Sequence, residues 1–194
     1  LDTQQLYRRN ANRSTVACQN GIVCASQPLA TMVGIDVLKA GGSCVDAAIA
    51  TNAMLGLTEP GSDGIGGDLF AIVWSQQDQR LFGLNASGRA PYEWNLERAR
   101  EKQLERIPRE SPLSWTVPGC VSGWAALNER FGKLDLARCL EPAISYAEEG
   151  FPVSPVIATT QFGYWTAERF PHLAAVYHPE GKIPMFGDVF RNPF

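Results

Sequence analysis

A glycine-rich loop, Gly61-Ser62-Asp63-Gly64-Ile65-Gly66-Gly67, separates a helical pattern from an apolar strand pattern. Phosphate-binding loops have the opposite order, because a strand leads into the loop and the amino terminus of the next helix faces the anion. No Lys-Ser or Lys-Thr pair follows the loop, which excludes a Walker A motif. The loop therefore predicts either a tight turn that feeds a central strand or a backbone wall beside an active site.

The patterns on both sides of this loop predict helices and one hairpin. Leu69–Trp74 and Arg80–Asn85 are two strand patterns joined by a short polar turn. Before the loop, one helix begins at Pro28 with Ser26 as candidate cap and ends at Gly41-Gly42. A second helix begins with the capping box Ser43-Cys44-Val45-Asp46 and continues to about Gly56.

The remaining chain predicts a helix-rich α+β fold around this central hairpin. Further expectations are a short buried strand at 21–25, helices at 95–105, 119–131 and 136–150, one more helix within 152–170, and an irregular end after 170. Residues 1–20 are expected to be loose or extended. No terminal element closes the fold, so residues 1–194 predict a single incomplete domain.

Composition excludes several classes of protein. The chain has 194 residues, of which 45% are hydrophobic, enough apolar surface to exclude intrinsic disorder. Its 17 basic residues are diluted by 20 acidic ones, so no nucleic-acid partner is expected. No apolar stretch has the length of a membrane span, and no secretory segment begins the chain. The compartment stays open between cytoplasmic and periplasmic.

The residues alone provide no complete catalytic set. Gly119-Cys120-Val121-Ser122-Gly123 has the wrong spacing for a serine-hydrolase elbow. The two histidines, His172 and His178, lack a metal-binding frame, so neither a metal nor a cofactor is expected. Other reactive side chains are interpreted as structural: Glu141, Glu148 and Glu149 as a solvated helix face, and Cys18, Cys24, Cys44, Cys120 and Cys139 as small buried thiols, which favours a reducing compartment.

Ordered sequence landmarks from residue 21 onward resemble a known family. The most distinctive are Glu59-Pro60-Gly61-Ser62-Asp63-Gly64-Ile65-Gly66-Gly67-Asp68 and Val117-Pro118-Gly119-Cys120-Val121-Ser122-Gly123-Trp124. They are accompanied by residues 21–30, 38–48, 131–134, 142–144, 148–153 and 187–193. In this order and spacing, they resemble the first part of the large subunit of gamma-glutamyltranspeptidases.

The resemblance implies an N-terminal nucleophile hydrolase with a four-layer αββα sandwich. Members of the family are made as long precursors that cleave themselves into a large and a small subunit. The new amino-terminal threonine of the small subunit is the nucleophile, and its amine is the base. The resemblance therefore implies that no catalytic residue lies in this chain, that the small-subunit portion of the same precursor is its partner, and that the chain alone is inactive and prone to self-association.

Two residues are candidates for substrate binding. In typical members, the Arg of an R-E-x-A-P motif binds the α-carboxylate of the γ-glutamyl group, a task that suits a bidentate guanidinium. Aligned on Ala90-Pro91, that position is Ser87, and Arg89 lies two residues later. On an extended strand, the two would share a face, so that Arg89 reaches the same pocket. Alternatively, Arg89 is a structural ion-pair residue.

Three functions follow from these observations. The first is a glutathione-type amidohydrolase or acyltransferase that acts on γ-glutamyl amides. Because of Ser87, the second is a related acylase that acts on another amide. The third is a binding domain without chemistry. The coding sequence after Phe194 distinguishes the third from the others, since only an enzyme of this family continues to a threonine-led small subunit.

Overall fold

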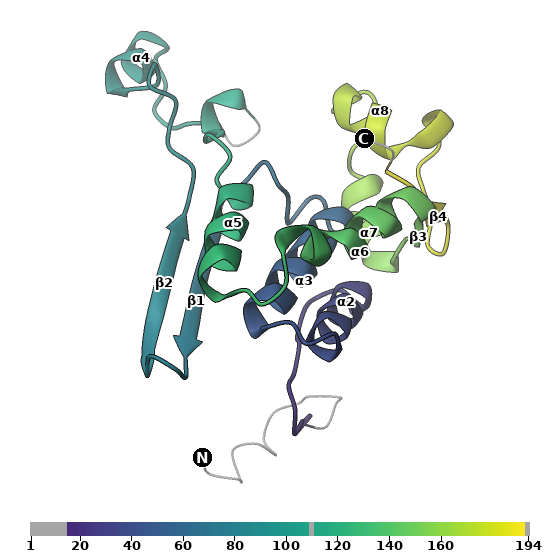
Figure 1. The fold of residues 1–194 in the computed structure, drawn as a ribbon. Coiled ribbons are helices and arrows are strands. Elements are labelled where there is room, and N and C mark those ends of the chain that lie inside the picture. The colour runs from purple at the N-terminus through teal and green to yellow at the C-terminus, as the bar shows by residue number, and fades with distance from the viewer. Residues whose placement is uncertain (1–14, 109–110, 193–194) are drawn as a thin grey trace.

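The computed structural model describes residues 15–108 and 111–192 and has a mixed helix and strand fold (Figure 1). This confirms the expected helix-rich α+β class with a central hairpin. In chain order, its helices and strands are α2 (Pro28–Lys39), α3 (Cys44–Thr58), β1 (Leu69–Ser75), β2 (Arg80–Ala86), α4 (Leu96–Glu101), α5 (Cys120–Phe131), α6 (Leu136–Glu149), β3 (Phe151–Pro152), α7 (Pro155–Ile157), α8 (Pro171–Tyr177) and β4 (Val189–Phe190).

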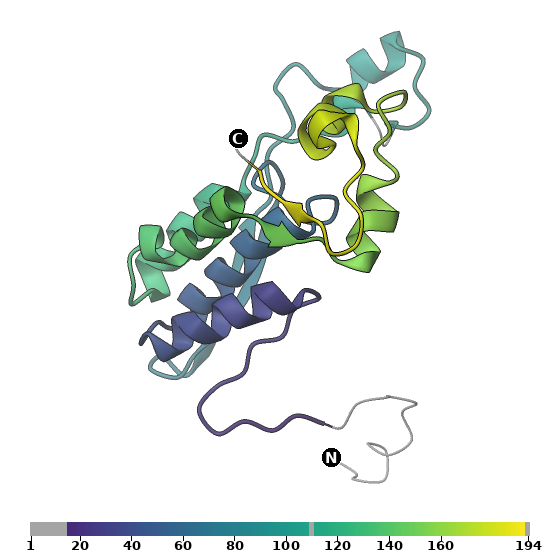
Figure 2. The same cartoon turned by 90° about the vertical axis from the view of Figure 1, so that its right-hand side faces the viewer.

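Helix α3 is the centre of the larger core. It packs against α2, α6 and α5 (Figure 2), and α5 in turn contacts both strands of the hairpin. Small residues let α2 and α3 approach closely: a Cβ added to Gly34 would collide with the Thr51 hydroxyl oxygen and lie 2.8 Å from a Val23 methyl group. The core around this contact is apolar, with Ala30, Val33, Val37, Ala47, Ile49, Ala50, Met54, Trp124, Leu127 and Cys139 buried.

The ends of these helices follow the expected capping chemistry with one correction. Ser43 and Asp46 form the predicted capping box of α3, and Gly41 adopts a φ of +91° just after α2. The cap of α2 is Gln27 rather than Ser26, because the Gln27 side chain accepts the Leu29 N–H at 2.8 Å. The Ser26 hydroxyl instead donates to Glu59 Oε2 at 2.9 Å.

The hairpin has one packed face and one exposed face. Its antiparallel register pairs Leu69 with Ala86 and Ser75 with Arg80. Leu69, Ala71 and Val73 contact the larger core, whereas the alternate side chains point away from it. The exposed face carries four large apolar side chains, Phe70, Ile72, Trp74 and Leu81.

A second, aromatic cluster lies near the end of the chain. Phe151, Phe162 and Phe190 form its buried centre, and β3 pairs antiparallel with β4. The helix expected within 152–170 is present as α7, which continues into a π-turn, Ala158–Phe162, where Gly163 N–H donates to Ala158 O at 3.0 Å. The end expected to be irregular contains α8, because Pro171 occupies its first turn, where proline needs no backbone partner.

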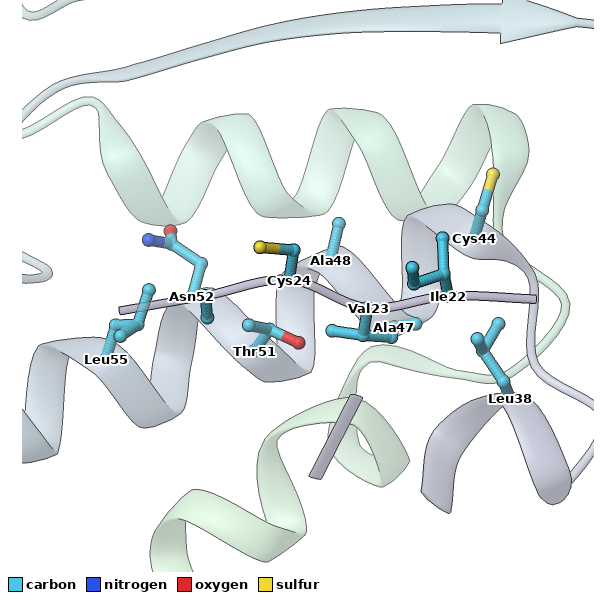
Figure 3. A pocket seen from close by; sticks show the side chains of 11 residues that line it. Ile22, Val23, Cys24, Leu38, Cys44, Ala47, Ala48, Thr51, Asn52 and Leu55 are labelled. Atoms are coloured by element: carbon cyan, nitrogen blue, oxygen red, sulfur yellow. The ribbon is translucent and has the colours of Figure 1, made fainter. Parts of the chain in front are cut away.

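The segment 21–25 was expected to form a strand, and that expectation is wrong for this chain. It runs beside α3 (Figure 3), and no segment within residues 15–108 and 111–192 pairs with it, whereas strand structure needs a neighbouring ladder. Val23 and Ala25 pack inward, while Ile22 and Cys24 remain exposed. A cavity of about 350 Å³ lies between this segment and α3, and the buried hydroxyl of Thr51 at its wall lacks a hydrogen-bond partner.

The burial of the cysteines and glutamates tests how the sequence interpreted these side chains. Only Cys120 and Cys139 are buried, so the prediction of five buried thiols is wrong for Cys18, Cys24 and Cys44. The glutamates of α6 are exposed, as expected. Within residues 15–108 and 111–192, no helix combines the length and apolar character needed to cross a membrane.

Candidate functional site: the rim at the end of the hairpin

Ser87 and Arg89 lie just beyond the end of β2, in a segment held by hydrogen bonds to other parts of the chain. The Gly88 N–H donates to Asp68 Oδ1 at 2.9 Å, and the Val117 N–H donates to the Arg89 carbonyl at 2.9 Å. The Thr116 hydroxyl also donates to Asp68 Oδ1, at 3.1 Å. Asp68 thus joins the segment after β2 to the chain before α5. We call residues 87–89 the rim.

The rim requires glycine at its centre. A Cβ at Gly88 would collide with the Val117 carbonyl oxygen, so no larger residue fits between the two segments. Ser87 is fixed on the other side, because its N–H donates to Asn85 Oδ1 at 2.9 Å. These contacts fix the backbone of residues 87–89 directly after β2, in a segment that is neither strand nor turn.

The glycine loop, Gly61–Gly67, lies beside the rim. The Gly67 carbonyl accepts the N–H groups of Gly119 and Cys120, both at 3.0 Å, which joins the loop to the start of α5. Near its other end, Asp63 accepts the Asn52 amide at 3.4 Å. The loop thus packs against the start of α5 next to the rim, and it leads directly into β1.

Arg89 offers the rim a cation. Its side chain is exposed, and none of the residues in the described ranges pairs with its guanidinium. The hydroxyl of Ser87 is also exposed, two residues away. A guanidinium and a hydroxyl two residues apart can hold a carboxylate by charge-assisted hydrogen bonds.

No nucleophile in the described part of the chain is activated near this rim. Cys120 is the nearest thiol on α5, but burial, and then the charge of Asp63, raise its pKa, so it stays protonated. His178 is buried in the aromatic cluster, where its Nε2–H donates to the Phe162 carbonyl at 2.8 Å. His172 is exposed on α8. Among the described residues, these thiol and imidazole groups therefore supply no activated nucleophile beside the rim.

Sequence reasoning did not single out Asp68, Thr116 or Gln161 as parts of this region. Asp68 follows the glycine loop directly, which was the available signal. Thr116 lies 48 residues from Asp68, and no local pattern indicates that contact.

Solved structures of two related enzymes resemble this fold. The helices and hairpin match the solved structure of Helicobacter pylori gamma-glutamyltranspeptidase with a TM-score of 0.82 and 27% identity, covering 92% of this chain and 52% of that one. They also match cephalosporin acylase from Bacillus halodurans with a TM-score of 0.85 and 42% identity, covering 96% and 36%. The fold is therefore part of the N-terminal nucleophile hydrolase architecture, as the resemblance implied.

The sequence profile described as "Gamma-glutamyltranspeptidase" matches residues 30–194, and the chain belongs to this family. The "Glutathione hydrolase-like YwrD proenzyme" of Bacillus subtilis is 34% identical over 181 residues, which cover 92% of this chain. The match covers 34% of that relative, so the chain spans about a third of its length.

Proposed function

We propose that this chain is the first part of a gamma-glutamyltranspeptidase-like precursor that cleaves or transfers γ-glutamyl amides. The observation that carries the proposal is the family match over residues 30–194, together with an exposed cation, Arg89, on the rim. The attacking threonine belongs to the downstream portion of the precursor, and residues 87–89 bind the α-carboxylate of the acyl group. The original amine is released, and the γ-glutamyl group passes either to water, which gives glutamate, or to an acceptor amine, which gives a new γ-glutamyl amide.

A second candidate is an acylase that acts on an amide without a γ-glutamyl group. The observation in its favour is Ser87, which occupies the position of the expected arginine, together with the 42% identity to a cephalosporin acylase. Both candidates use the same covalent chemistry. They differ in whether the rim must hold an α-carboxylate.

A pair of substrates distinguishes the γ-glutamyl enzyme from the acylase. The complete protein is assayed with γ-glutamyl anilide and with 4-aminobutyryl anilide, which lacks only the α-carboxylate. Arg89→Ala is expected to lower kcat/KM about 10- to 1000-fold for the first substrate and little for the second, because a bidentate charge-assisted contact is lost. Ser87→Arg is expected to strengthen the preference for the carboxylate.

The matched control is Arg98→Ala, which removes another exposed arginine from α4. It should leave both rates near those of the unmodified protein. If Arg89→Ala lowers both rates equally, Arg89 has a structural role and the acylase is favoured.

The proposed partner is the small-subunit portion of the same precursor. Two features support this partner. The apolar hairpin face is open around Ile72, which is 81% exposed, and segment 21–25 has no strand partner among the described residues. Both features are typical of surfaces that another layer and another strand cover. By this proposal, residues 1–194 are an incomplete domain that associates with itself when the partner is missing.

A further inference from the structure

The side chain of Gln161 bridges the aromatic cluster and the glycine loop. Its Oε1 accepts the Gly61 N–H at 2.9 Å, and its Nε2 donates to the Ser62 hydroxyl at 3.3 Å. The packing is tight, because a Cβ added to Gly61 would lie 2.8 Å from Gln161 Cδ. One amide thus holds two consecutive residues of a loop that is 100 residues away in sequence.

The backbone that carries Gln161 is itself fixed. Gln161 lies in the π-turn Ala158–Phe162, and the next residue, Phe162, is fully buried. The Phe162 ring packs against Tyr177 and Phe190, with ring centroids 5.5 and 5.2 Å away, and its carbonyl accepts the His178 imidazole N–H. A side chain on such a rigid backbone can position its partner accurately.

The loop carries this constraint to the rim. At its far end, the Gly67 carbonyl accepts the N–H groups of Gly119 and Cys120. The next residue, Asp68, accepts the Gly88 N–H and the Thr116 hydroxyl. A displacement of the loop would therefore shift the segment that bears Ser87 and Arg89.

We infer that Gln161 is a positioning residue of the site, which fixes the glycine loop and through it the substrate-binding rim. The inference deepens the proposed function and rests on it for the role of the rim. Gln161 itself touches no reacting atom.

Two substitutions with side chains about as long as Gln161 test whether its hydrogen bonds position the loop or only stabilise the fold. Gln161→Met keeps the length of the side chain and removes both hydrogen bonds. Gln161→Glu keeps an acceptor for the Gly61 N–H, and the Ser62 hydroxyl can donate to the other carboxylate oxygen. Thr160→Ala is the control, because the Thr160 hydroxyl bonds only to Val156 O within its own turn.

The first readout is hydrogen exchange of residues 61–67 in the complete protein. Gln161→Met should increase exchange in this loop and at the start of α5, while Gln161→Glu and Thr160→Ala should match the unmodified protein. Unchanged exchange in Gln161→Met overturns the inference, whether or not the protein cleaves any amide.

The second readout is the hydrolysis of γ-glutamyl anilide by the same proteins. Gln161→Met should lower kcat/KM about 10- to 100-fold, mainly through KM, as misplacement of a substrate-positioning group does. Gln161→Glu should restore most of the rate, and the unfolding midpoint of each variant should stay within about 2 °C. Faster loop exchange with unchanged KM and kcat would overturn the role in the site. Absence of activity in the unmodified protein contradicts the proposed function instead.

Discussion

The carboxylate of Asp46 accepts the backbone N–H of Lys133 at 2.8 Å and so joins the first turn of α3 to the connection between α5 and α6. The same carboxylate accepts the N–H groups of Ser43 and Leu134 and the amide of Asn128. The Cys139 thiol lies 3.8 Å from Asp46 Oδ1, and burial, followed by the charge of Asp46, raises its pKa to about 11. Asp46 is fully buried, and all its neighbours in this network are donors.

Asp46→Asn is expected to be strongly destabilising despite its similar shape. In either orientation, the new NH₂ group faces donors, so buried N–H groups lose their acceptor. The expected loss is about 3 kcal/mol, measured by urea unfolding of the complete protein. Asp36→Asn is the control, since its salt bridge to Lys39 is exposed and should contribute no more than about 1 kcal/mol. Equal effects of both substitutions would contradict the account of this network.

Acid should weaken the same network. Burial alone raises the pKa of Asp46, but hydrogen bonds from Lys133 and Ser43 outweigh burial and hold the pKa below its ordinary value. The unfolded state therefore binds more protons, and the stability from Asp46 is complete above the ordinary pKa of about 3.9 and is lost as pH falls through the lowered one. As the pH is lowered from 6, the urea concentration at the unfolding midpoint should decline less steeply in Asp46→Asn than in the unmodified protein. Equal slopes in the two proteins would show that Asp46 is not the titrating group.

The sequence predicted the local features well because their causes are local. The capping box of Ser43 and Asp46, the hairpin turn and the glycine stop after α2 each depend on a few consecutive residues. The hydrogen bond between Asp46 and Lys133 joins residues that are 87 positions apart, and the one between Gln161 and Gly61 joins residues that are 100 positions apart. No periodic pattern indicates such contacts. The strand expected at 21–25 was wrong because strand pairing depends on a second segment, and the described residues supply none.

The close contact of α2 with α3 makes Gly34 intolerant of a methyl group. Although Ala favours a helix interior over Gly by about 1 kcal/mol, Gly34→Ala should destabilise the protein by about 1–3 kcal/mol, because the Cβ overlaps the Thr51 hydroxyl. In the background of Thr51→Ala, the loss should be smaller. Gly83→Ala, where no atom lies within 4 Å of the new Cβ, is the control. Additive losses at positions 34 and 51 would contradict the proposed overlap.

The apolar hairpin face should drive self-association of the 194-residue chain. Ile72→Lys places a charge at its centre and should shift the chain toward the monomer in light scattering, since exposed apolar patches mark interaction surfaces. Ile144→Lys, at an exposed position on α6, is the control and should leave the association unchanged. A monodisperse unmodified monomer would count against the incomplete domain.

The most direct measurement compares γ-glutamyl anilide hydrolysis by residues 1–194 and by the complete precursor. We expect the complete protein to hydrolyse the anilide through a covalent acyl intermediate. We expect the chain alone to show only the buffer rate, because a bound substrate without a nucleophile has no covalent step to accelerate. Hydrolysis by the chain alone well above the buffer rate, or no cleavage of any amide by the complete protein, would contradict a downstream nucleophile.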